Sequence, residues 1–247
     1  MSAGEDQPPL PRRRSQRREV VIAGTADIDA LGHVIADAFH ELPQSEWLIP
    51  DARARRQILP GYFGLLVEEA IAGGTAHTTP DRAAVALWLP VTAEPAARTT
   101  GYAARLTAVT GRWADRFAAF DAVLDRNRPR GVAYHHLAIL AVTPARQDTG
   151  LGSALLRAYH EILDREGALA YLEAAGLRSR QLYQRHGYLP SGAIRLPEDG
   201  PMMWPMARPS FDRWPASTAL EPTATAATPT GLSGKVPRPR KELDTGP

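Results

Sequence analysis

Two glycines, Gly150 and Gly152, stand in the segment from Val142 to Ser153, where an apolar run gives way to a helical pattern. Glycine has no Cβ, so the backbone can come close to a ligand there. The first N–H groups of a helix have no partner within the helix, and the helix dipole adds partial positive charge at that end. Such a helix start binds anions and suits a pyrophosphate, and Arg146 can add a charge-assisted contact at the rim.

The spacing of these glycines excludes two common nucleotide loops. A Rossmann loop requires G-x-G-x-x-G, and Leu155 stands in the place of the third glycine. A Walker loop requires Gly-Lys-Ser/Thr, which the sequence does not contain. The anion site therefore belongs to another class of strand-loop-helix unit.

The composition narrows the chemistry further. The chain has 247 residues and no cysteine, which excludes disulfides, thiolate metal sites and cysteine nucleophiles. The histidines lack the H-E-x-x-H spacing of a zinc helix, so we expect no metal. No apolar run approaches the ~20 residues that cross a bilayer, and no apolar stretch follows the N-terminal arginines as in a secretory signal. We expect a cytoplasmic protein without membrane contact.

The chain divides into three parts. Residues 1–17 hold prolines and arginines with little to bury and predict a disordered basic arm. Residues 210–247 are rich in Thr, Ala and Pro and predict a flexible tail, which leaves 18–209 as one folded domain. The net charge is only +2, so we expect no nucleic-acid partner, although the basic ends leave nonspecific binding open. Monomer and homodimer both stay open.

Two hydrophobic periods alternate within the domain. Strands are expected at 19–23, 75–79, 83–89, 134–142, 168–173, 188–194 and 202–206. Helices are expected at 26–39, 51–72, 95–126 with a break near Thr110-Gly111, 150–166 and 177–186. Residues 43–50, bounded by two prolines, are expected to form a loop that contains Trp47. The order predicts an α+β fold with a mixed twisted sheet, flanked by helices and built around a β-α-β unit.

The string V-x-P-x-x-Q-x-x-G-x-G-S, following L-A-I-L-A-V, resembles motif A of the GNAT superfamily of N-acetyltransferases, written Q/R-x-x-G-x-G/A. The segment from Arg178 to Tyr188 is similar to the family's N-x-x-x-Y-x-x-x-G-F, with Ser179 in the place of the asparagine. Residues 132–207 carry this resemblance. In residues 19–131, the run AAVALWLP looks similar to puromycin N-acetyltransferase and its actinobacterial relatives.

The resemblance implies the GNAT acyl-CoA N-acyltransferase fold, with acetyl-CoA as co-substrate. The cofactor-binding residues that it implies are Leu140, Ala141, Val142, Arg146, Gln147, Asp148, Thr149, Gly150, Leu151, Gly152, Ser153, Ser179 and Tyr183. In the family, the strand that ends at Val142 splays from its neighbour, and its free backbone groups pair with the pantetheine arm. One N–H of that strand polarises the thioester carbonyl, an oxyanion-hole role.

The resemblance also implies catalytic roles. Tyr183 matches the general acid, since a phenol with a pKa near ~10 can protonate the leaving thiolate. Glu173 ends the next strand and either takes the proton of the amine or only holds the substrate cation; both roles stay open. Adjacent strand residues face opposite sides, so at most one of His135 and His136 points into the site, and His136 is the candidate.

The acceptor is the least determined part. His40 and Trp47 lie in the region that forms the acceptor wall in this fold, and together with His136 and Glu173 they are the candidate substrate-binding residues. We expect transfer from acetyl-CoA to a small-molecule primary amine, for example an antibiotic or secondary metabolite, which would be an antibiotic-resistance activity. A protein lysine or N-terminus as acceptor, and a CoA-binding regulatory domain without turnover, stay open as alternatives.

Overall fold

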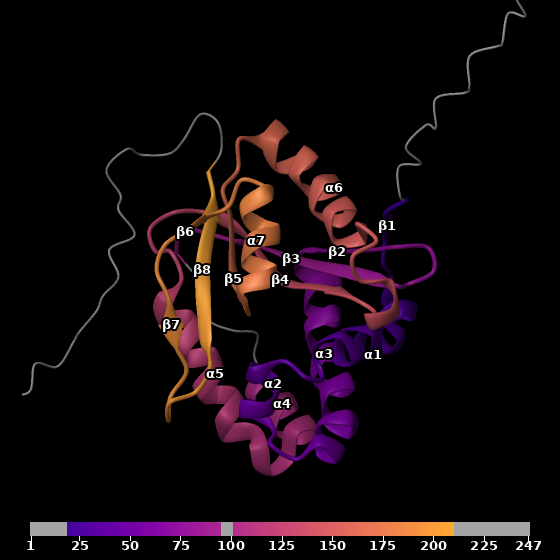
Figure 1. The fold of residues 1–247 in the computed structure, drawn as a ribbon, viewed down its shortest axis with the longest axis vertical. Coiled ribbons are helices and arrows are strands. Elements are labelled where there is room, and N and C mark those ends of the chain that lie inside the picture. Colours follow the sequence, from indigo (N-terminus) through magenta and orange to yellow (C-terminus); the bar gives the residue numbers. More distant parts are fainter. Residues whose placement is uncertain (1–18, 95–100, 210–247) are drawn as a thin grey trace, which may run out of the picture.

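An eight-stranded mixed sheet forms the centre of the protein in a computed structural model that describes residues 19–94 and 101–209 (Figure 1). The expected arm at 1–17 and tail at 210–247 lie outside the described residues. The strand order is β1-β2-β3-β4-β5-β8-β6, with β7 paired to β8. The strands are β1 (Val21–Ile22), β2 (Thr75–Thr78), β3 (Ala84–Val91), β4 (Tyr134–Val142), β5 (Ala170–Ala174), β6 (Leu189–Pro190), β7 (Ile194–Arg195) and β8 (Met202–Arg208). The predicted α+β architecture is confirmed.

Helices cover both faces of this sheet. The α-helices are α1 (Ile28–Phe39), α2 (Pro43–Leu48), α3 (Ala52–Gly73), α4 (Tyr102–Thr110), α5 (Ala114–Asn127), α6 (Leu151–Glu166) and α7 (Leu177–Arg185). Val85 and Leu87 of β3 pack in the core with α1 and α3, whereas Ala86 and Trp88 pack in the core with α6. Because neighbouring strand residues face opposite sides of the sheet, β3 contributes to a hydrophobic core on each side.

The parallel pair β4 and β5 separates soon after it forms. Only His135↔Ala170 and His136↔Tyr171 are paired, and the rest of β4 runs beside β3 alone. The β3–β4 register shifts between Leu87 and Trp88, which pair with Ile139 and Leu137, so Ala138 is an extra residue on β4. Such a bulge bends a strand and leaves one residue without a ladder partner. The backbone between the separated strands is thus available to a ligand.

Two local expectations are wrong. Residues 43–48 form the short helix α2, not a loop, because Pro43 stands at the first helical position, where its fixed φ and missing N–H cost nothing. The single strand expected at 188–194 is two short strands, β6 and β7, since Pro190 lacks an N–H and Gly192, at φ +124°, turns the chain. The predicted helical break at Thr110-Gly111 is present as a 3₁₀ turn at Gly111–Trp113.

Candidate active site

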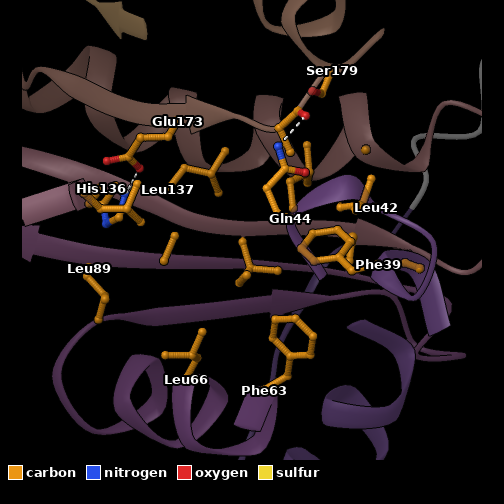
Figure 2. Close-up of a pocket in the computed structure, with 18 of the residues that line it drawn as sticks. Phe39, Leu42, Gln44, Phe63, Leu66, Leu89, His136, Leu137, Glu173 and Ser179 are labelled. Atoms are coloured by element: carbon orange, nitrogen blue, oxygen red, sulfur yellow. Dashed lines mark hydrogen bonds and ion pairs between the residues drawn. The ribbon is translucent and has the colours of Figure 1, made fainter. Parts of the chain in front are cut away.

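A cavity of about 1240 Å³ opens between the separated strands and the helices below the sheet. One end is lined by the loop that follows β4, the start of α6 and the start of α7. The other end is lined by α1, α2, α3 and α5 together with the end of β3. Figure 2 shows His136 and Glu173 at one side of the view, and Gln44 with Ser179 at the other.

The phosphate-binding signal of the sequence lies at the first end. Gly150 precedes α6 with φ +81°, a left-handed conformation that glycine adopts without strain, and Asp148 has φ +59°. The exposed side chains of Arg146 and Arg178 also line the cavity there. Arg146 Nη1 is 2.9 Å from Asp81 Oδ2, and Arg178 pairs with Asp148. Exposed ion pairs of this kind are weak, so both guanidinium groups can exchange partners for a phosphate.

The structure brings most of the predicted cofactor-binding residues to this cavity. Those that line it are Leu140, Ala141, Val142, Arg146, Gln147, Asp148, Gly150, Leu151, Gly152, Ser153, Ser179 and Tyr183. Thr149 does not, and its hydroxyl donates to the carbonyl of Arg146 at 2.5 Å.

Two hydroxyls of this set already have partners. Ser179 Oγ accepts from Gly176 N at 3.2 Å and donates to Gly176 O at 2.9 Å, so it caps the start of α7. Ser153 Oγ lies 3.0 Å from Nε2 of His186. The helix starts therefore present backbone N–H groups, not these hydroxyls, to a ligand.

Tyr183 lines the cavity from α7 and is only 7% exposed. Its ring packs edge-on against Tyr188, with 5.7 Å between the centroids. Its hydroxyl has no hydrogen-bond partner within residues 19–94 and 101–209. Burial raises the pKa of Tyr183 above its usual value, so the phenol keeps its proton at neutral pH.

His136 and Glu173 form a buried pair at the point where β4 and β5 separate. Glu173 Oε2 lies 2.8 Å from His136 Nε2, and the side chains are 4% and 5% exposed. Arg128, beyond the end of α5, places its Nε 3.8 Å from Glu173 Oε1. Burial alone would raise the pKa of Glu173, but the charges of His136 and Arg128 and the hydrogen bond from His136 outweigh it and hold the pKa below its usual value.

The remaining histidine and tryptophan candidates lie elsewhere. His135 faces the other side of the sheet, where its Nδ1 is 2.9 Å from the hydroxyl of Tyr159. His40 caps the end of α1 and does not line the cavity. Trp47 is also outside the lining, because its indole donates to the carbonyl of Pro197 at 3.1 Å while Arg116 lies over its ring.

Sequence reasoning missed the second end of the cavity. It is mostly apolar, and its larger members are Phe39, Leu42, Tyr62, Phe63, Leu66, Leu89, Phe120, Leu124 and Met203. The carboxylates of Glu68, Glu69 and Asp121 also line it. These residues come from α1, α3, α5, the α1–α2 connection and the strands β3 and β8, which are distant in sequence, and no local motif marks them.

Comparison with known proteins agrees with this geometry. Residues 115–190 match the family model of the acetyltransferase (GNAT) domain. The matched range runs from α5 through the helix start at Gly150 to α7 and β6, so it includes the loop that follows β4 and Tyr183. Over this range the chain is similar to the GNAT acetyltransferases. GNAT acetyltransferases are N-acetyltransferases that use acetyl-CoA.

Solved structures share the fold of this protein. A protein from Corynebacterium glutamicum described as "histone acetyltransferase HPA2 and related acetyltransferase" is 26% identical, with a TM-score of 0.60 over 80% of this chain and 97% of its own. A putative arylalkylamine N-acetyltransferase 7 from the yellow fever mosquito is 15% identical, with a TM-score of 0.55 over 77% of this chain and 86% of its own. Arylalkylamine N-acetyltransferase 2 from Aedes aegypti is 12% identical, with a TM-score of 0.51 over 77% and 98%.

Within residues 19–94 and 101–209, no helix is long and apolar enough to cross a membrane. The same residues contain no group of three or more His, Cys, Asp or Glu side chains placed to hold a metal ion.

Proposed function

We propose that this chain transfers the acetyl group of acetyl-CoA directly to the primary amine of a small molecule. The observation that carries the proposal is the meeting of three groups in one cavity: the opened backbone of β4, the hydroxyl of Tyr183 and the His136–Glu173 pair. The cavity fits the donor, because its loop end offers helix N–H groups and arginines to phosphates. Beyond the last ladder pair at His136, the separated strands leave room for an extended arm.

His136 and Glu173 act together as the base in this proposal. A carboxylate only accepts hydrogen bonds, so His136 carries its proton on Nε2 when it pairs with Glu173. In the neutral tautomer that donates from Nε2, the other ring nitrogen, Nδ1, has a free lone pair and no partner among the described residues. Nδ1 takes a proton from the amine, and Glu173, held by Arg128, stabilises the imidazolium that forms.

The transfer step balances with one acid and one base. The amine nitrogen attacks the thioester carbon, its proton passes to His136, and the C–S bond breaks. Tyr183 donates its proton to the leaving thiolate. An N–H of β4 near the bulge at Ala138 stabilises the oxyanion, because the bulge turns ladder groups away from β3.

The lining of the second end supports a small amine with an apolar body. Apolar side chains dominate there. Glu68 is paired with Arg105, and Asp121 accepts a hydrogen bond from Tyr102. This leaves Glu69 as the carboxylate that favours a cationic head group. Antibiotics and other secondary metabolites are within this class, in line with the puromycin N-acetyltransferase-like pattern of the first half of the sequence. The second candidate acceptor is a protein lysine, since the similar protein from Corynebacterium glutamicum is described as a histone acetyltransferase and related acetyltransferase.

Release of free CoA thiol, followed with a thiol-reactive chromogen, tests the proposal. The chain has no cysteine, so the protein itself gives no signal. The panel comprises arylalkyl and alkyl primary amines, aminoglycosides, nucleoside amines and lysine peptides. We expect turnover with apolar primary amines. Turnover with peptides alone would favour the protein-lysine function, and CoA binding without turnover on any amine would favour a regulatory domain.

A further inference from the structure

Gln44 lines the cavity and carries a buried hydrogen-bond acceptor without a partner among the described residues. The residue lies on α2, lines the cavity and is only 5% exposed. Its Nε2 donates to the carbonyl of Ala175 and to the carbonyl of Met202, each at 3.0 Å. Both partners are acceptors, so the amide orientation is fixed and Oε1 points away from them. Oε1 is buried and has no partner among the described residues.

An unpaired buried acceptor is costly, roughly 1–3 kcal/mol for a neutral group. Native proteins rarely leave one, and an empty partner position inside a cavity indicates a ligand group. Carbonyl oxygens of a ligand would be repelled by Oε1, which accepts only. The group that fits is an N–H or O–H donor.

The position of Gln44 along the strands identifies that donor. The His136–Glu173 pair lies where β4 and β5 separate, and Glu173 is on β5. Ala175, to which Gln44 is bound, is two residues farther along the chain, or about 7 Å at the rise of a strand. The phosphate-binding loop lies beyond the end of β4. Gln44 therefore lies between the reacting centre and the phosphates, beside the opening that the donor's arm would fill.

We propose that Gln44 is a further binding residue, whose Oε1 accepts a hydrogen bond from an amide N–H of the pantetheine arm of acyl-CoA. The inference rests on the proposed function, because it requires that CoA occupies this cavity. It adds a contact from α2, a helix that lies outside the region matched by the GNAT domain, residues 115–190.

Two substitutions separate the proposed contact of Gln44 with CoA from its hydrogen bonds to the carbonyls of Ala175 and Met202. Gln44→Met removes both the donor and the acceptor, whereas Gln44→Lys keeps donors for the two carbonyls and has no acceptor. We expect both variants to bind CoA about 5- to 10-fold more weakly by titration calorimetry, the effect of one lost hydrogen bond. Gln44→Met should also unfold at a lower temperature, because the carbonyls of Ala175 and Met202 lose their donor. Gln57→Lys, on the exposed side of α3, is the charge-matched control and should bind CoA like the unaltered protein.

CoA analogues complete the test. Each pantetheine amide is replaced in turn by an ester, which removes the N–H and keeps the shape. For one of the two analogues, we expect a 5- to 10-fold loss with the unaltered protein and little further loss with Gln44→Lys.

Three results would overturn the proposal. Normal CoA binding by Gln44→Lys would leave Gln44 with the bridging role alone. Equal losses of affinity for the ester analogues in the unaltered protein and in Gln44→Lys would show that Gln44 does not contact a pantetheine amide. A higher KM for the amine at unchanged CoA affinity would assign Gln44 to the acceptor. Failure of the unaltered protein to bind CoA would instead refute the proposed function itself, so the two failures are distinguishable.

Discussion

Oε2 of Glu173 lies 2.8 Å from Nε2 of His136, and His136 is the last residue of β4 that pairs with β5. Both side chains are nearly enclosed, so the hydrogen bond fixes one orientation of the imidazole. The pair thus has the geometry of a base and the group that orients it.

Glu173→Gln should slow turnover by about 100-fold, because the neutral amide cannot stabilise an imidazolium as a carboxylate does. CoA affinity should stay within twofold, as measured by calorimetry beside the kcat of the same preparation. Glu166→Gln is the matched control, since Glu166 lies 3.9 Å from His135 on the other face of the sheet. Equal losses in both variants would mean that the effect is only structural.

The His136–Glu173 pair also makes the stability of the protein depend on pH. The pKa of Glu173 is held below its usual value, so its contribution to stability is complete above the usual carboxyl range and is lost as the pH falls through the lowered pKa. Glu173→Gln should therefore lower the free energy of unfolding at pH 7 more than at pH 3. Urea titrations at the two pH values measure the difference, and a pH-independent loss would contradict it.

Tyr183→Phe should reduce kcat by about 10²–10⁴-fold, the usual contribution of a general acid, and leave CoA binding unchanged. The hydroxyl has no other partner within the described residues, so its removal should cost little stability. Tyr188→Phe is the control, because that hydroxyl lies 3.0 Å from His160 Nε2 and outside the cavity. Unchanged kcat in Tyr183→Phe would exclude this residue as the acid.

Leu66→Trp should narrow the apolar end of the cavity, which Leu66 lines from α3 in a half-buried position. We expect kcat/KM to fall about tenfold or more for bulky amines and much less for short ones, while CoA affinity is kept. Ile22→Trp, at an exposed position of β1, should change neither. An equal loss for all amines would show that the acceptor does not reach α3.

His160 makes stability depend on pH. Burial, with Arg208 and His186 as further causes, lowers its pKa to about 3. The unfolded chain binds the proton more readily, so stability is complete above the ordinary histidine pKa and falls as the pH drops from there towards 3. The loss should reach roughly 2 kcal/mol at pH 5. His160→Gln should remove it in urea unfolding at pH 7.5 and pH 5, whereas His33→Gln, at an exposed site, should not.

Gly32 and Gly64 face each other across α1 and α3 and should respond oppositely to alanine. A Cβ at Gly32 would lie 2.6 Å from the carbonyl oxygen of Pro60, so overpacking of about 1–3 kcal/mol outweighs the helix propensity gained. A Cβ at Gly64 would meet only Ile28 Cγ2 at 3.7 Å, and the substitution should stabilise by about 0.5–1 kcal/mol. Chemical unfolding of both variants measures the two signs.

The sequence predicted the parts of the site that are local. Strand β4, the loop to Gly150 and helix α6 are contiguous, so their period and glycines could be read directly. Gln44 could not be found this way, because its partners Ala175 and Met202 are 131 and 158 residues away. The positions of His40 and Trp47 had been inferred from a presumed loop. Helix α2 turns Trp47 towards Pro197 instead, and Pro43 at its first position was the overlooked signal.

The sheet is joined between β4 and β5 by only two residue pairs. The sheet therefore consists of two halves joined by a short contact. The amides of Leu137–Val142 that face the gap between β4 and β5 exchange with solvent more readily than those of a complete ladder. An extended molecule bound in the gap would supply hydrogen-bond partners to the free backbone groups of both strands. Its binding should therefore slow the hydrogen exchange of these amides and stiffen the sheet, whatever acceptor binds afterwards.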